Sequence, residues 1–200
     1  MILHLKQITL WSLPLMAISL IIQASIYKFR IRRISAKGLK TTLYHELAIA
    51  GFVVYLSFVL TVTLSLDRIW VPLSHGWPLP KITWFSGTVN LIPFKNTFAM
   101  RDIAMLAENI ILFFPLGFFV SLLWYHEKWL RTVRVHLVFS LVIECIQIII
   151  GRCFDVDDLL MNTVGAQLGY ALWRIINMRV PSFSNALHIH GKRSLQNEQN

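Results

Sequence analysis

Apolar runs separated by short polar segments dominate the chain. A bilayer core about 30 Å thick needs about 20 apolar residues in a helix. Five runs approach that length, and they occupy residues 8–27, 47–66, 103–124, 133–150 and 159–176. The first two runs hold no charged residue, whereas carboxyl and amide side chains interrupt the other three. The pattern predicts an all-α integral membrane protein with five transmembrane helices.

The composition supports this fold class and limits the kinds of binding partner that we expect. Hydrophobic residues make up 56% of the chain and charged residues 14%, whereas roughly a quarter of the residues in a soluble domain are charged. Much of the net charge of +9 falls between Lys28 and Lys40, directly after an apolar run, which is typical of a cytoplasmic loop near anionic lipid. We therefore expect the lipid bilayer as a partner and no nucleic acid. Cys145 and Cys153 offer neither a disulfide framework nor metal-ligand spacing.

The distribution of Lys and Arg predicts the orientation of the helices. The basic segment 28–40 follows the first apolar run instead of preceding it, which favours an uncleaved helix with its N-terminus outside. With five spans, thirteen Lys and Arg fall on the inner side and six on the outer side. We therefore expect a multi-pass protein with its N-terminus outside and its C-terminus in the cytoplasm.

Two segments outside the runs have their own character. Residues 67–102 would lie outside the cell, and their Trp and Phe side chains among prolines suit an interfacial loop on the lipid headgroups. An ordinary loop with some buried aromatic residues is the alternative. The tail from Pro181 is rich in Ser, Asn and Gln, which predicts a disordered cytoplasmic segment.

Polar side chains inside the runs are expected to meet near the outer ends of the helices. An ionisable residue near the centre of a span costs about 2.5–3.5 kcal/mol, so such residues usually face a bundle interior or a cavity. In the predicted topology, the polar positions of the last three runs gather at the outer leaflet beside the segment GRCFDVDDLLMN at 151–162. The sequence therefore predicts an outward-facing polar cavity lined by Glu108, Asn109, Glu144, Gln147, Arg152, Asp155, Asp157, Asp158 and Asn162.

Several of these residues also have a structural explanation. Asp157 and Asp158 would cap a helix and favour its macrodipole, and Arg152 would neutralise one of their carboxylates. Glu108 and Glu144 would serve, when protonated, as hydrogen-bonding groups between helices. The residues alone leave both explanations open.

Small residues mark one face of the last run. Asp158, Asn162, Gly165 and Gly169 are three or four residues apart, so they share one stripe of a helix. Gly165 and Gly169 form a GxxxG step, which lets a neighbouring helix approach closely. We expect helix packing at this step, either within the chain or in a homodimer.

Four motifs follow one another in the order seen in VanZ-like proteins. They are NLIPF at 90–94, ENIILFFPLG at 108–117, ECIQ at 144–147 and RCFDVDD at 152–158, the last followed by Asn162, Thr163 and Gly165. The chain therefore resembles the VanZ-like family over residues 47–176, although that family more often has Asp or Asn at position 108. This divides the chain into a helix and basic loop over 1–46, a four-helix VanZ-like domain over 47–176 and a tail over 177–200.

The resemblance implies a protein of the bacterial plasma membrane, in a family named for low-level resistance to the lipoglycopeptide teicoplanin. It brings no established enzymatic mechanism, and the chain has no Gly-x-Ser-x-Gly, HExxH or P-loop motif. We therefore favour a non-enzymatic function, in which the cavity binds a lipid-linked wall precursor or another amphiphile of the envelope.

Two alternatives use the carboxylates chemically. In a metal-dependent enzyme acting on a phosphorylated lipid, Arg152 would hold the phosphate. A hard divalent cation would then be coordinated by Glu108, Glu144, Asp155, Asp157 and Asp158. In a small transporter, the buried carboxylates would instead form a proton or cation relay.

Overall fold

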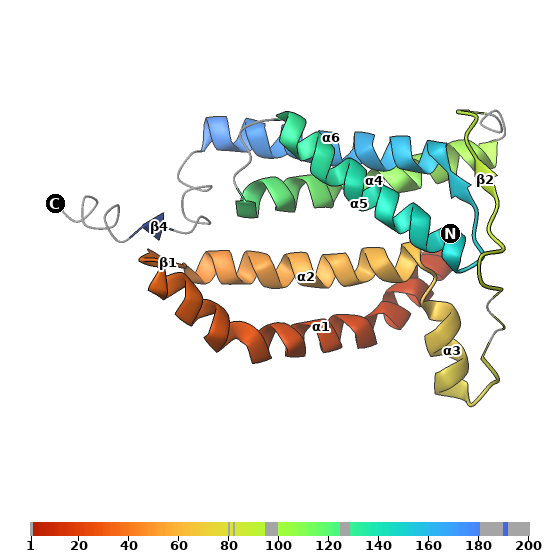
Figure 1. The fold of residues 1–200 in the computed structure, drawn as a ribbon, viewed down its shortest axis with the longest axis horizontal. Helices are drawn as coiled ribbons and strands as arrows, with labels where there is room; N and C mark the ends of the chain where they lie inside the picture. The colour runs from red at the N-terminus through yellow and green to blue at the C-terminus, as the bar shows by residue number, and fades with distance from the viewer. Residues whose placement is uncertain are drawn as a thin grey trace.

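The computed structural model is built almost entirely of α-helices (Figure 1). It describes residues 2–79, 81, 83–94, 100–124, 129–180 and 190–191. The helices are α1 (Ile2–Ala36), α2 (Leu43–Thr63), α3 (Asp67–His75), α4 (Met100–Trp124), α5 (Trp129–Ile149) and α6 (Val156–Arg179). Two short strand pairs join β1 (Leu39–Lys40) to β4 (His190–Gly191) and β2 (Val89–Asn90) to β3 (Phe154–Asp155). Apart from β4, the tail from Pro181 lies outside the described residues.

Four of the described helices are long and apolar enough to cross a membrane. They are Leu10–Ala36 of α1, the whole of α2, Ile103–Trp124 of α4 and the whole of α5. α6 has 24 residues but is less hydropathic, because Asn162, Gln167 and Arg174 interrupt its apolar side chains. These helices confirm the all-α membrane class, while the fifth span and the orientation stay predictions.

The helices form two groups in Figure 1. α1 and α2 lie side by side in the lower group, and α4, α5 and α6 form the upper group. The turn between α5 and α6 gathers with the C-terminal end of α2 and with β2 at one end of the bundle. We call this the hairpin end, after residues 150–155. The C-terminal ends of α1 and α6 lie at the other end with β1 and β4, and we call it the basic end, after Arg33 and Arg179 in the last turns of these two helices.

The two helix groups meet in an apolar core. Val59 of α2, Phe113 of α4 and Ile143 of α5 are buried in one cluster. The hydroxyl of Tyr55 donates a hydrogen bond of 2.5 Å to the backbone carbonyl of Leu112, which ties α2 to α4. The upper and lower groups therefore pack as one bundle.

Glycines bring the backbones of α4 and α6 into direct contact. A Cβ atom on Gly165 would lie 2.3 Å from the carbonyl oxygen of Ile110, and one on Gly169 would lie 1.9 Å from that of Phe114. Gly117 of α4 approaches α6 in the same way. Only hydrogen fits at these positions, so the GxxxG step is covered by α4 of the same chain.

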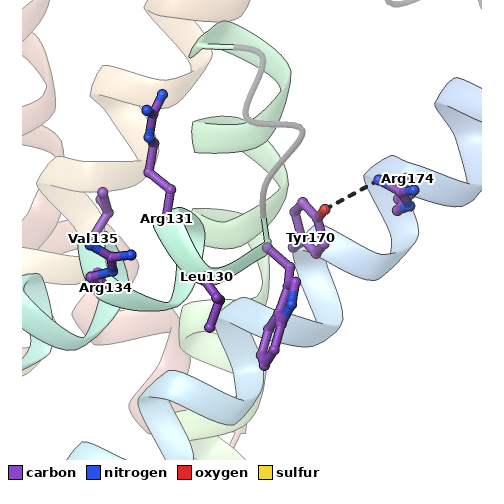
Figure 2. A pocket seen from close by; sticks show the side chains of 7 residues that line it. Leu130, Arg131, Arg134, Val135, Tyr170 and Arg174 are labelled. Atoms are coloured by element: carbon purple, nitrogen blue, oxygen red, sulfur yellow. Dashed lines mark hydrogen bonds between the residues drawn. The ribbon is translucent and has the colours of Figure 1, made fainter.

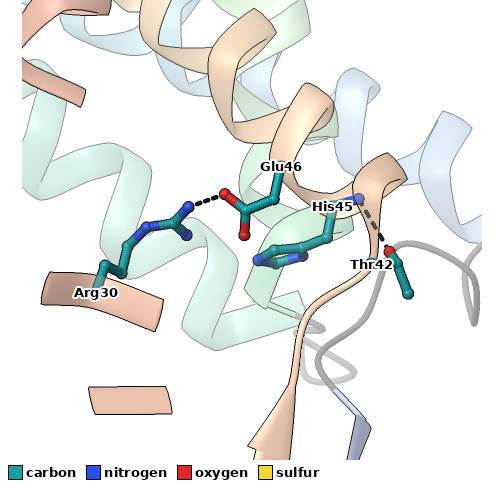
Figure 3. Close-up of polar contacts among 4 residues, drawn as sticks. All are labelled: Arg30, Thr42, His45 and Glu46. Atoms are coloured by element: carbon teal, nitrogen blue, oxygen red, sulfur yellow. Dashed lines mark hydrogen bonds and ion pairs between the residues drawn. The ribbon is translucent and has the colours of Figure 1, made fainter. Parts of the chain in front are cut away.

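α1 continues further than its apolar run. Lys28, Arg30, Arg32 and Arg33 belong to the last turns of this helix instead of a loop, because apolar residues alternate with them and long basic side chains can reach past an apolar surface. The guanidinium of Arg30 forms an ion pair with Glu46 in the first turn of α2 (Figure 3).

Residues 67–102 contain a helix that the apolar pattern did not predict. α3 has nine residues and includes Pro72, so it is far too short to appear as one of the long apolar runs. Gly76 ends it in the left-handed conformation, with a φ of 66°, which favours glycine. The ring of His75 stacks on that of Trp77 with 4.7 Å between their centroids.

Candidate functional site

The turn between α5 and α6 is covered by residues 83–94, which we call the docking loop. β2 and β3 pair in parallel, with Val89 opposite Phe154 and Asn90 opposite Asp155. The backbone N–H of Phe154 donates a hydrogen bond of 2.8 Å to the backbone carbonyl of Thr88. A Cβ atom on Gly87 would lie 2.1 Å from the carbonyl oxygen of Arg152, so the loop backbone lies directly on the turn.

Asp155 organises the start of α6. Its carboxylate accepts a hydrogen bond of 3.0 Å from the backbone N–H of Asp157, which makes Asp155 the N-cap. The same carboxylate accepts from the amide Nδ2 of Asn90, at 3.1 and 3.2 Å to its two oxygens. A single side chain therefore both caps α6 and holds the docking loop.

The side chain of Glu144 in α5 holds the backbone of the turn at Asp155. Its side chain is 1% exposed in α5, and Oε2 accepts a hydrogen bond of 3.2 Å from the backbone N–H of Asp155. The buried carboxyl group thus binds a backbone donor of the turn that would otherwise lack a partner in the bundle.

The next two aspartates bind two different segments. Asp157 is buried and accepts the backbone N–H of Phe94, at 2.9 and 3.0 Å to its two oxygens. Asp158, which precedes the apolar run of α6, accepts a hydrogen bond from Nδ2 of Asn109 in α4. Burial raises the pKa of Asp158 above its usual range, and the nearby carboxylate of Asp155 adds to this effect.

Arg152 and Gln147 reach the C-terminal end of α2. Nη1 of Arg152 donates to the carbonyl oxygen of Thr63 at 2.5 Å and to Oγ of Ser65 at 2.9 Å. Nε2 of Gln147 donates to the same carbonyl at 2.8 Å. A cation at this position also favours the negative end of the helix dipole, so Arg152 joins the turn to α2.

Asn162 and Gln147 leave acceptors in the interior. Nδ2 of Asn162 donates to Oγ of Ser140 at 2.9 Å, and both side chains are buried. Oδ1 of Asn162 and Oε1 of Gln147 are buried without a hydrogen-bond partner in the described part of the chain. These oxygens are free to accept a hydrogen bond from a bound group or from water.

The structure brings together all the residues of the sequence-derived set except Glu108. The side chain of Glu108 is exposed on α4, whereas that of its neighbour Asn109 turns toward Asp158. Among the described residues, no three His, Cys, Asp or Glu side chains are placed to hold a metal ion.

Some partners of this cluster were not identified from the sequence. Asn90 and Phe94 lie in the NLIPF motif, but the motif alone gave no sign that it would pair with the aspartates. Thr63, Ser65 and Ser140 are small polar residues in or beside apolar runs and carry no distinguishing signal.

Comparison with known proteins identifies the family. The sequence model of the VanZ/LLP1 family matches residues 47–177. The chain is 33% identical over 91 residues to Protein VanZ of Enterococcus faecium, a match that covers 45% of this chain and 55% of that protein. The chain thus spans about half the length of this relative. No solved structure matches the chain. With the membrane helices and the four motifs in place, the chain belongs to the VanZ-like family of membrane proteins.

Proposed function

We propose that the hairpin end faces the outside of the plasma membrane and binds an amphiphilic component of the cell envelope. The orientation is supported by the basic residues: the last turns of α1 and α6, which carry Arg33 and Arg179, lie at the other end, and cytoplasmic segments carry the excess of Lys and Arg. In this arrangement α6 is the fifth span and the docking loop lies at the outer headgroups.

The observation that carries the proposal is a fixed loop with an apolar outer surface. Trp84, Phe85, Leu91 and Ile92 of the docking loop are between 58% and 75% exposed. The polar groups of the same loop face the other way, since Asn90 and the backbone of Phe94 bind Asp155 and Asp157.

Such a surface suits an amphiphile more than a water-soluble ligand. Exposed aromatic and aliphatic side chains favour an acyl or prenyl chain, and an ordered loop loses little conformational entropy on binding. The carboxylates of Asp155 and Asp157 already accept hydrogen bonds from Asn90 and from the backbone of Phe94. This geometry supports a role in holding the docking loop in place for binding. In a VanZ-like protein, this binding would alter what a teicoplanin-type lipoglycopeptide reaches at the outer leaflet.

The test compares loop variants in living cells at equal expression. Binding of a fluorescent teicoplanin-type lipoglycopeptide is measured for cells without the protein, with the wild type and with Trp84→Ala/Phe85→Ala. Ile111→Ala is the matched control, because Ile111 is 71% exposed but lies on α4 away from the loop. We expect the wild type and the control to change the binding and the loop variant to abolish that change. A loop variant that behaves like the wild type would contradict the proposal.

A further inference from the structure

A second site lies at the basic end, far from the docking loop. A pocket of about 900 Å³ opens between the start of α5 and the last turns of α6 (Figure 2). It is lined by Trp129, Leu130, Arg131, Arg134, Val135, Tyr170 and Arg174. The cluster at the hairpin end contributes no residue to this pocket.

The pocket is strongly positive. Arg131, Arg134 and Arg174 line it from different sides (Figure 2), and no carboxylate is among the lining residues that the structure describes. Nη1 of Arg174 donates to the hydroxyl of Tyr170 at 3.5 Å (Figure 2). Arg131 lies in the first turn of α5, where the helix dipole also favours an anion. The excess of positive charge favours an anionic ligand, and phosphate is an anion for which guanidinium groups are suited donors.

The walls of the pocket are apolar. Trp129, Leu130 and Val135 line it and are exposed beside the arginines. A free inorganic anion gains nothing from these side chains, whereas a lipid places its phosphate among the cations and its chains along the apolar wall. Because α5 is long and apolar enough to span the membrane and α6 is the proposed fifth span, this wall would face the bilayer.

We propose that this pocket binds the phosphate headgroup of an anionic phospholipid. Arg131 and Arg134 attract the headgroup from the α5 side, Arg174 adds its charge from the α6 side, and Trp129 packs against the start of an acyl chain. The bound lipid would bridge the ends of the two helices. This site does not depend on the function of the hairpin end.

The test measures binding of a short-chain phosphatidylglycerol to the purified full chain in a neutral detergent. The triple variant Arg131→Gln/Arg134→Gln/Arg174→Gln is compared with Lys28→Gln/Arg32→Gln/Lys37→Gln, which removes the same charge from exposed positions at the same end. At about 1 kcal/mol for each basic residue, we expect about a hundredfold weaker binding for the pocket variant. The control variant is expected to bind nearly as tightly as the wild type.

Two further binding measurements identify the ligand. Phosphatidylcholine of the same chain length should bind weakly, and inorganic phosphate at the same concentration should not compete. Equal losses in the two triple variants would overturn the pocket as a specific site. Competition by phosphate alone would overturn the lipid as its occupant. If the Gln variant does not fold, Arg131→Lys/Arg134→Lys/Arg174→Lys keeps the charge, and wild-type affinity in it would contradict the guanidinium geometry.

Discussion

The carboxylate of Asp157 accepts the backbone N–H of Phe94 at 2.9 and 3.0 Å, across 63 residues of sequence. This bond ties the end of the docking loop to the first turn of α6. Removing it by Asp157→Ala should cost about 1.5–3 kcal/mol, the usual range for a hydrogen bond to a charged group. Thermal unfolding in detergent measures the cost, and limited proteolysis should cut residues 83–94 faster. Asp157→Asn keeps one acceptor oxygen and should lose less; equal losses in the two variants would speak against this bond.

The second prediction concerns Gly169, where a side chain would collide with α4. We expect Gly169→Ala to lower the free energy of unfolding by about 3 kcal/mol, the upper part of the range for overpacking. Gly51→Ala is the matched control, since a Cβ on Gly51 would lie 3.8 Å from the ring of Phe119, an ordinary contact. The control should unfold near the wild-type temperature. Equal unfolding temperatures for the two variants would contradict the close helix contact.

The ion pair of Arg30 and Glu46 joins α1 to α2 near the basic end. Both side chains are partly exposed, and Glu46→Gln removes only the negative charge while keeping an acceptor oxygen, so it should cost about 1 kcal/mol, the upper part of the range for exposed pairs. The exchange Arg30→Glu/Glu46→Arg restores opposite charges and should recover much of the loss. Chemical unfolding in detergent provides the comparison. An exchange variant as unstable as Arg30→Glu alone would show that the pair is not the cause.

Asp158 gives the protein a predictable pH dependence. Because burial raises its pKa in the folded state, the neutral carboxyl stabilises the fold fully below the ordinary Asp pKa of about 3.9, and this contribution is lost as the pH rises through the raised pKa. Asp158→Asn stays neutral and can still accept from Asn109. Its unfolding temperature should therefore exceed that of the wild type at neutral pH and approach it in acid. Parallel curves across that range would exclude the effect.

Cys153 allows a direct test of orientation. It is exposed in the turn between α5 and α6, and Cys145 is exposed within α5. In a Cys145→Ser background, a membrane-impermeant maleimide should label Cys153 in intact cells. A Ser35→Cys variant that lacks both native cysteines should be labelled only after the membrane is permeabilised. The reverse result would invert the proposed topology.

The sequence predicted the long helices well and their connections poorly. Apolar runs located α2, α4 and α5 to within a few residues, because each long helix in a membrane must be apolar over much of its length. α3 and the pairing of β2 with β3 depend on contacts between distant segments, which a local pattern does not contain.

Glu108 and Asn109 show the same limit inside the site. Both interrupt one apolar run, and neighbouring helix positions point about 100° apart. The rotation of α4 is determined by its contact with α6 through Gly117 and Gly165, and it turns Asn109 toward Asp158 while leaving Glu108 exposed. Spacing along one helix could predict that a polar cluster forms, but not which of two neighbours would join it.

The contact between α4 and α6 also has a consequence for biogenesis. The glycines that allow it belong to helices that α5 separates in the chain. During synthesis, α4 and α5 are made before α6, so the backbone of α4 around Ile110 and Phe114 has no glycine face to pack against until α6 is made. We therefore expect chains truncated before Gly165 to be substrates for membrane quality control, even though they already contain all four described helices that are long and apolar enough to span.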